Sequence, residues 1–215
     1  MKARALFLTI ATVLLLSGCA QSSQKYAANK DVGAYFTVPT KWIKINERSL
    51  HKAEVAGADA AGREKASLVL WQEAYTKHPL ISAKEIFGIN PTEHPIAFTR
   101  VRQLTMAESN GVSLNSLRDL IIPVTKLYAG ESSVVSDFVL LDDEEMIEKG
   151  ARGVRTTFSF TPPGSKNETV KQTALISDDR TTLYFFIVRC STKCFKANTE
   201  EIDKISDSFT VRGVR

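Results

Sequence analysis

Apolar and polar residues alternate most clearly in the last third of the chain. Over 154–160, every second residue is apolar or a threonine, and Arg155, Thr157 and Ser159 stand between them. A period of two predicts a β-strand with one buried face and one face in water. The run Leu183–Val188 is apolar throughout, which predicts a central strand covered on both faces.

Further strands are predicted from short apolar runs bounded by turn residues. Turn-rich joints at 162–165 and 177–180 predict that the last strands form an antiparallel meander. Pro39 interrupts the first run, and because proline cannot donate to a strand ladder, that bent pair of strands belongs at a sheet edge. The predicted strands cover 34–45, 67–74, 98–106, 136–141, 154–161, 169–177 and 182–189.

Two stretches have helical periodicity. Ser113 can cap a helix over 114–121, where leucines recur at helical spacing until Pro123 ends it. Near the end of the chain, Asn198 can cap a helix in which Glu201 reaches back to the cap. The segment 49–65 is either a short helix or a mobile loop, and 77–95 is predicted to be irregular. The apolar face of the closing helix is expected to cover the sheet that contains Phe158, Phe160 and the strand 182–189; it consists of Ile202, Ile205 and Phe209.

The first residues follow a different pattern. Lys2 and Arg4 precede an apolar run over 5–16, which is shorter than the roughly 17 to 25 residues of a membrane-spanning helix. A basic start, a short apolar run and small residues are typical of an export signal. The segment 16–19, Leu-Ser-Gly-Cys, resembles the bacterial lipobox, which implies cleavage after residue 18 and acylation of Cys19. The alternative is an ordinary secretory signal in which Cys19 is incidental.

Export and acylation would divide the chain into three parts. Residues 1–18 are the predicted lipoprotein signal peptide, 19–33 a lipidated flexible tether, and 34–212 one domain. The tether is predicted because 20–30 is small and polar without an apolar period. The lipid on Cys19 would hold the protein in the bacterial cell envelope, on the outer face of the cell membrane. In a cell with two membranes, Ala20 in place of an aspartate favours the outer membrane.

Charge and cysteine content narrow the function further. The predicted signal removes two of the 28 basic residues and none of the 24 acidic ones, which leaves a net charge of +2 and argues against a nucleic-acid binder. Cys190 and Cys194 are either a local disulfide, which an exported chain permits, or two free thiols. A metal pair is disfavoured because the spacing does not match a zinc knuckle and no histidine is near in sequence.

Three loose motifs are spread over the predicted domain. They are the aromatic-x-Val-Pro-x-x-Trp segment over 36–42, the apolar strand 183–188, and the closing Ile-Ser-Asp-Ser-Phe over 205–209. Together they resemble the PsbP-like superfamily, which includes PsbP and LpqN-type lipoproteins. The resemblance spans most of 34–212, but 77–112 matches nothing specific. It implies an α+β fold, with an antiparallel β-sheet flanked by helices in an α/β/α sandwich. It implies no enzymatic activity, because members are mostly binding or assembly modules.

The common catalytic and metal motifs are missing from the sequence, so no catalytic, cofactor or metal residue is predicted. The three histidines, His51, His78 and His94, would need proximity in space to form a site. The acidic run 142–145 lacks EF-hand spacing and is predicted to be a solvated strand end or turn. Trp42, Trp71 and Tyr75 are predicted to pack in the core. Four arginines either line an anion-binding groove, if their strands are neighbours, or lie on the wet face of a sheet: Arg100, Arg102, Arg152 and Arg155.

The sequence therefore favours a lipid-anchored, non-catalytic binding or assembly protein of the cell envelope. Its expected partners are the membrane, through Cys19, and a protein or an envelope component, with no nucleic acid and no cofactor. The alternatives are an envelope enzyme with a nonstandard site and a carrier of a small apolar ligand. A cleft with converging ionisable groups would favour the enzyme, a large apolar cavity the carrier, and a flat apolar patch partner binding.

Overall fold

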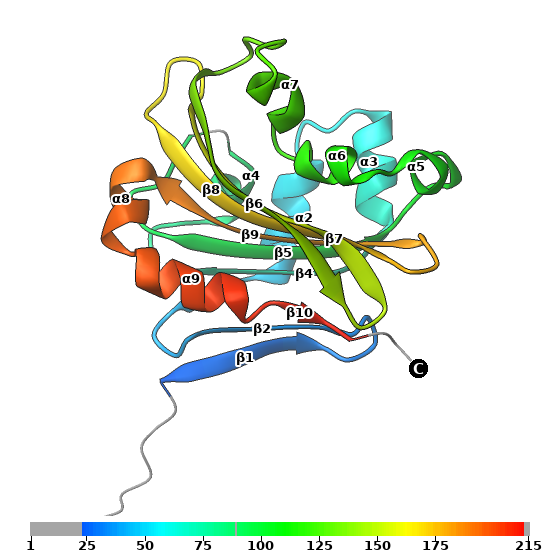
Figure 1. Cartoon of the computed structure of the whole chain (residues 1–215). Helices are drawn as coiled ribbons and strands as arrows, with labels where there is room; N and C mark the ends of the chain where they lie inside the picture. Colours follow the sequence, from blue (N-terminus) through cyan, green and yellow to red (C-terminus); the bar gives the residue numbers. More distant parts are fainter. Residues whose placement is uncertain (1–22, 89, 213–215) are drawn as a thin grey trace, which may run out of the picture.

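The computed structural model describes residues 23–88 and 90–212 and is an α+β fold in three layers (Figure 1). Its middle layer is a seven-stranded antiparallel sheet in the order β3-β4-β5-β9-β8-β7-β6. The prediction of an antiparallel sheet flanked by helices is confirmed. The strands are β3 (Ile43–Ile45), β4 (Val69–Thr76), β5 (Ile96–Gln103), β6 (Ser136–Glu148), β7 (Ala151–Thr161), β8 (Glu168–Ser177) and β9 (Thr182–Ser191).

The last four strands form the predicted meander, because each pairs antiparallel with the next. Gly150, with a φ of 90°, makes the tight turn between β6 and β7, where an L side chain would be strained. Glycine is required at position 153 for a different reason. A Cβ there would lie 1.9 Å from the carbonyl oxygen of Ala174, so only glycine allows β7 to approach β8 this closely.

A second, three-stranded sheet has the order β1-β2-β10 and is built from the two ends of the domain. Its strands are β1 (Gln24–Asn29), β2 (Ala34–Pro39) and β10 (Thr210–Val211). The prediction of a flexible tether over 19–33 is wrong for 24–29, and the folded domain begins ten residues before residue 34. Small polar residues form this strand because β2 supplies a continuous partner from Gln24 to Asn29, and Ala27 is buried beneath it.

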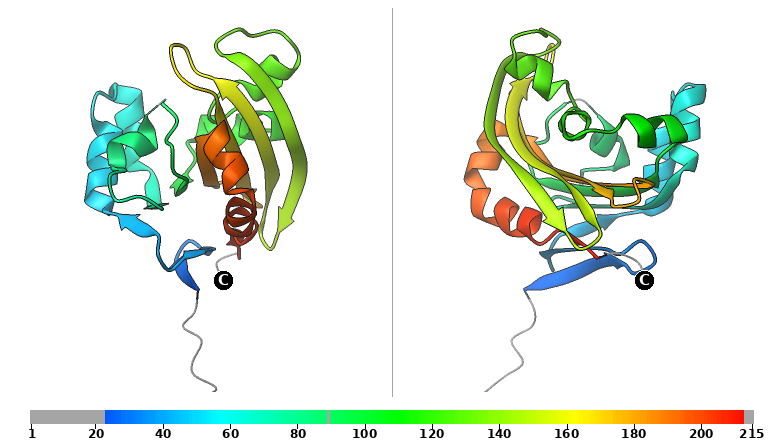
Figure 2. Two further views of the ribbon diagram at one scale, coloured as in Figure 1. Left: turned by 90° about the vertical axis from the view of Figure 1, so that its left-hand side faces the viewer. Right: turned by 45° about the vertical axis from the view of Figure 1, so that its right-hand side comes forward.

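The outer face of the large sheet carries Val101, Tyr184, Phe186 and Val188 and is covered by α8, α9 and the small sheet. Figure 2 shows the orange and red helices on this side of the curved sheet. The two helices are α8 (Thr192–Ala197) and α9 (Thr199–Asp207). Ile202, Ile205 and Phe209 are buried here, as predicted. Phe209 follows the end of α9, however, and its ring stacks on Phe186 with centroids 4.9 Å apart.

Two details of that prediction are wrong. Phe158 and Phe160 lie on the opposite, inner face of the sheet, so Phe209 does not pack against them. Asn198 is the N-cap residue of α9, but its side chain makes no cap hydrogen bond, and Glu201 pairs with Lys77 instead. The period of two identifies which residues share a face, but it does not say which layer covers that face.

The inner face, which carries Phe98, Phe158, Phe160 and Ile187, is covered by short helices. Leu50, Ile86, Leu117 and Val124 are the buried contacts of four of them. The segment 49–65 is thus largely helical, 77–95 contains one helix, and the helix predicted over 114–121 ends at Arg118. The helices are α2 (Glu47–Val55), α3 (Ala60–Ser67), α4 (Ala83–Phe87), α5 (Met106–Gly111), α6 (Leu114–Arg118) and α7 (Val124–Tyr128).

The strand β7 is buried on both faces, which corrects the prediction of one wet face. Arg155, Thr157 and Ser159 are each less than 10% exposed on the outer face.

Cys190 at the end of β9 and Cys194 in α8 form a disulfide with a Cα–Cα distance of 5.9 Å. It joins the strand end to the following helix. No helix among the described residues is long and apolar enough to cross a membrane.

Candidate functional site

An apolar hollow of the inner face lies between the sheet, α4 and the segment that joins α6 to α7. Its volume is about 410 Å³. It opens over strands β5, β7, β8 and β9, against the predicted irregular segment 77–95, which supplies α4. Its walls are mostly aliphatic and aromatic: Ile86, Phe87, Gly88, Phe98, Leu120, Ile121, Ile122, Val135, Phe160, Pro162, Pro163, Phe185 and Ile187, with Arg100, Glu168 and Arg189 among them.

Arg189 and Glu168 form a buried ion pair at one side of this pocket, with side chains 6% and 3% exposed. The Nη2 of Arg189 also donates to the carbonyl oxygens of Glu85 (2.7 Å), Ile86 (3.3 Å) and Gly88 (2.9 Å). These carbonyls lie at the end of α4, where helix geometry leaves them without backbone partners. Burial raises the pKa of Glu168, and the Arg189 charge opposes that rise. The pair therefore fixes α4 against the sheet.

Arg100 reaches the pocket from β5, and its guanidinium has fewer hydrogen-bond partners than that of Arg189. Its Nη2 lies 2.7 Å from the Glu54 carboxylate of α2, but the angle is not that of a hydrogen bond, and its Nε also has no hydrogen-bond partner among the described residues. The guanidinium lies over the rings of Phe87 and Phe98, 5.5 and 5.4 Å from their centroids. Burial lowers the pKa of Arg100, and the Glu54 charge opposes this.

A smaller hollow of about 230 Å³ adjoins the pocket at Leu120 and extends along the inner face. Leu104, Val112, Leu117 and Leu183 line it. An apolar cavity of a few hundred Å³ with a small number of oriented polar groups is typical of a small-molecule binding site. A ligand in the pocket can thus bury apolar surface, and the Arg100 guanidinium in the wall can donate a hydrogen bond to a ligand oxygen.

The four arginines singled out in the sequence do not form one anion-binding groove. Arg100 and Arg102 are on β5 and Arg152 and Arg155 on β7, with β9 and β8 between those strands. Arg102 is held by Glu108 through two hydrogen bonds of 2.8 Å. The hypothesis of a shared groove is wrong, because the register and pleat of the sheet separate these side chains.

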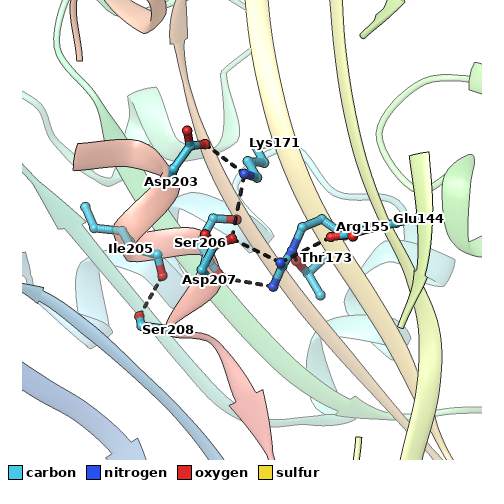
Figure 3. Close-up of polar contacts among 9 residues, drawn as sticks. All are labelled: Glu144, Arg155, Lys171, Thr173, Asp203, Ile205, Ser206, Asp207 and Ser208. Carbon is cyan, nitrogen blue, oxygen red and sulfur yellow. Dashed lines mark hydrogen bonds and ion pairs between the residues drawn. The ribbon is translucent and has the colours of Figure 1, made fainter. Parts of the chain in front are cut away.

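Arg155 instead holds α9 to the outer face (Figure 3). Its guanidinium donates to Thr173 (3.1 Å), to Asp207 (3.0 Å) and to the carbonyl oxygen of Ser206 (3.2 Å), and a longer contact of 3.3 Å reaches Glu144. Lys171 adds a 2.7 Å contact to Asp203. These contacts connect α9 to β6, β7 and β8. The arginine is therefore a structural group rather than a free anion site.

The acidic run 142–145 lies inside β6 and not at a strand end or turn, which corrects the sequence-based prediction. Asp143 accepts from Arg118 of α6 at 3.0 Å and from Thr156 at 2.9 Å. The side chains of Asp142 and Glu145 make no hydrogen bond or ion pair with any described residue, although the Arg118 charge also acts on Glu145.

The rings of His78 and His94 stack face to face with centroids 4.2 Å apart, although sixteen positions separate them in the sequence. His51 lies on α2. Within residues 23–88 and 90–212, no three histidine, cysteine, aspartate or glutamate side chains are placed to hold a metal ion. Trp42, Trp71 and Tyr75 are all buried in the outer core, as predicted. Cys19 lies outside the described residues.

The ion pair of Arg189 and Glu168 was not predicted from the sequence. One signal was available: Arg189 directly follows the apolar run of β9, where a charged residue requires a partner. The partner is identified only by the register, which places Val170 opposite Arg189 and brings Glu168 close on the same face.

Solved structures with a similar arrangement include the solution structure of the PsbP protein CyanoP from Synechocystis sp. PCC 6803. It is 14% identical with a TM-score of 0.47, over 91% of this chain and 96% of that one. LpqN of Mycobacterium tuberculosis, described as involved in cell envelope biogenesis, is 12% identical with a TM-score of 0.47, over 88% and 91%. The Ran-binding protein Mog1p of Saccharomyces cerevisiae is 8% identical with a TM-score of 0.44, over 87% and 95%.

No protein-family model matches the sequence, and no curated protein is similar to it in sequence. The solved structures are similar to this chain at low identity. At 12 to 14% identity, this likeness concerns the arrangement of strands and helices and not the residues of the pocket.

Proposed function

We propose that this protein is a lipid-anchored binding protein of the bacterial cell envelope that holds a small, mainly apolar ligand in the inner-face pocket. The observation that carries the proposal is the pocket itself, about 410 Å³ with aliphatic and aromatic walls. Filling such a pocket removes apolar surface of both ligand and protein from water, which favours binding by about 25 cal/mol per Å² before the cost of association.

The charged groups of the pocket support binding rather than chemistry on the ligand. Glu168 and Arg189 already bind each other, and Arg189 also holds the end of α4. Among the described wall residues there is no serine, threonine, cysteine or histidine to act as nucleophile or proton carrier. The envelope enzyme with a nonstandard site is the second hypothesis, and it requires Glu168 to leave Arg189.

The proposed anchor gives the domain a definite position. If Cys19 carries the lipid, five peptide steps separate it from Gln24, the first residue of β1. Their greatest reach is about 18 Å, at about 3.6 Å per residue. The three-stranded sheet would then lie close to the bilayer, because the long flexible spacer expected from the sequence is largely part of the domain.

The pocket can be tested with N-phenyl-1-naphthylamine, a neutral apolar dye whose fluorescence rises in apolar surroundings. The full chain, purified in detergent below its micelle concentration, should bind one dye per protein. Ile121→Trp adds bulk to the pocket wall and should lower the dye affinity at least about tenfold. The control Leu70→Trp places the same residue on an exposed site of β4 outside the pocket and should leave dye binding unchanged.

Equal dye binding by Ile121→Trp, Leu70→Trp and the unmodified protein would exclude the pocket as the ligand site. Turnover of an envelope ester or glycoside that stops in Glu168→Gln, while dye binding persists, would support the enzyme hypothesis instead.

The anchor needs a separate test, because the pocket would bind its ligand with or without it. In cells fed an alkyne fatty acid, the protein should become labelled, and Cys19→Ser should abolish the label and leave an uncleaved precursor or a soluble product. A label retained in Cys19→Ser would exclude acylation of this cysteine, and fractionation would then identify the compartment.

A further inference from the structure

The strand β6 forms an open border of the seven-stranded sheet (Figure 2). Among the described residues, its ladder is made on one side only, with β7. It is 13 residues long, whereas strands of about five or six residues are usual. A long border strand presents alternate backbone N–H and C=O groups outward, which makes it a template for another strand.

The second half of this strand is suited to such pairing. Register shifts interrupt the ladder between Ser136 and Val139 and between Leu140 and Asp142. From Asp142 to Glu148, the pairing with β7 is continuous over seven positions. Bulges disfavour addition of a strand, so the regular segment 142–148 is the accessible part of the edge.

This segment is acidic on both of its faces. Asp142 is paired with Thr157, on the outer face, and Glu145 with Val154, on the inner face. Asp143 and Glu144 have arginine partners, Arg118 and Arg155, but Asp142 and Glu145 have no ion-pair partner in the described part of the chain. These two carboxylates lie on opposite faces and neither is in an ion pair, although the Arg118 charge also acts on Glu145, and β6 contains no basic residue.

Exposed apolar side chains stand at both ends of the acidic run. Leu141 is 55% exposed and Ile147 is 86% exposed. If this edge were only protected from association, it would be expected to carry charged side chains alone, because charged residues are the usual protection of a border strand. The combination of apolar ends and an acidic centre gives the edge a pattern that a partner strand can match.

We infer that the segment 142–148 of β6 docks an extended polypeptide segment with consecutive lysine or arginine residues flanked by apolar ones, which adds to the sheet as an eighth strand. Opposite charges directly across a ladder stabilise the pairing of strands, and like charges destabilise it. A second copy of this chain is excluded as the occupant, because antiparallel pairing of two β6 strands would set acidic residues against acidic residues. This surface is separate from the inner-face pocket.

The probe is a ten-residue synthetic peptide with four central arginines and Val-Thr-Val on each side, tested against the full chain purified in detergent. Peptide titration should show saturable binding, and hydrogen exchange should show new protection of amides within 142–148. A peptide with four central glutamates should not bind. A third peptide, N-methylated at alternate residues, keeps the charge but cannot form the ladder and should bind at least about tenfold more weakly.

Asp142→Lys/Glu145→Lys tests the protein side, because it removes the two unpartnered carboxylates and should lower the affinity at least about tenfold. The matched control is Glu64→Lys/Glu131→Lys, which changes the net charge equally at exposed positions outside β6 and should change the affinity less than about twofold. Equal binding of the N-methylated peptide, or equal loss in both double variants, would reduce the interaction to general charge attraction and overturn the proposal. Cross-linking of two chains through Leu141→Cys in the absence of peptide would also overturn it, in favour of self-pairing.

Discussion

The two faces of the seven-stranded sheet are packed in different ways. On the outer face, aromatic rings fill the space between the layers: Phe186 lies 4.9 Å from both Phe36 and Phe209, measured between ring centroids. On the inner face, short helices cover the sheet only in part and leave a pocket of about 410 Å³. Close packing contributes most to stability, whereas an apolar hollow leaves surface that a ligand can cover.

The division between the faces also appears in Arg155 and Arg100. On the outer face, the Arg155 guanidinium makes hydrogen bonds from all three of its nitrogens. On the inner face, Arg100, Glu54 and the amide oxygen of Gln172 keep buried atoms without hydrogen-bond partners among the described residues, and on the outer face so do the indole nitrogen of Trp42 and the hydroxyl of Ser206. The Arg155 guanidinium is therefore fully occupied in holding α9, whereas Arg100 keeps N–H groups beside the pocket from which a ligand oxygen can accept a hydrogen bond.

The largest difference between the faces should come from aromatic truncation. Phe209→Ala should lower the free energy of unfolding by about 3 to 5 kcal/mol, because the side chain is fully buried between layers. Phe185→Ala removes a half-buried ring from the pocket wall and should cost only about 1 to 2 kcal/mol. Denaturant unfolding of both variants makes the comparison. Equal losses would mean that the inner face is packed as tightly as the outer one.

The charged groups should give a smaller difference. Arg155→Met should cost about 2 to 3 kcal/mol, since it removes several charge-assisted hydrogen bonds, and the control Arg152→Met, at an exposed site of the same strand, about 0.5 kcal/mol or less. The double variant Arg100→Met/Glu54→Met should stay within about 1 kcal/mol of the unmodified protein, because apolar residues can replace an imperfect buried pair. Denaturant melts measure all three, and a loss from the double variant as large as that from Arg155→Met would contradict the division.

Substitutions of Asp143 and of its neighbour Asp142 test the contacts of the acidic strand β6. Asp143→Ala should cost about 1 kcal/mol, because it removes bonds to Arg118 and Thr156, whereas Asp142→Ala should change stability by less than about 0.5 kcal/mol. Thermal melts in the same buffer compare them. If both substitutions were neutral, α6 would not be held to β6 through Arg118.

The smallest effect concerns acid stability at the border of the inner face. Hydrogen bonds from Arg102 lower the pKa of Glu108 from 4.5 to about 2. A folded pKa below the unfolded value stabilises the protein above about pH 4.5, and this contribution is lost as the pH falls from 4.5 towards 2. Since the pair is partly exposed, the loss should be at most about 1 kcal/mol. Melts at pH 6 and pH 3 should differ less in Glu108→Gln, and an unchanged difference would exclude this linkage.

Much of the architecture could be predicted from local patterns. The alternation over 154–160, the apolar run 183–188 and the turn residues between them identified the meander, and Ile202 and Ile205 identified the closing helix. The candidate site was not predicted as a site, and of its charged residues only Arg100 was singled out, as part of an anion-binding groove or of the wet face of a sheet. The sequence could not show that Glu168 pairs with Arg189, because the two residues lie 21 positions apart on different strands.

By itself, the sequence determined the order of the late strands and the residues that share each strand face, because these follow from short-range periodicity and turn chemistry, while the α+β class was implied by the resemblance of its motifs to a known superfamily. Only the tertiary structure decided which layer covers each face. It placed Phe209 on Phe186 and away from Phe158, buried Arg155 beneath α9, and made a strand of 24–29 by supplying β2 as its partner. Those outcomes depend on contacts between distant segments, and no local pattern records the partner that a side chain or backbone group will meet.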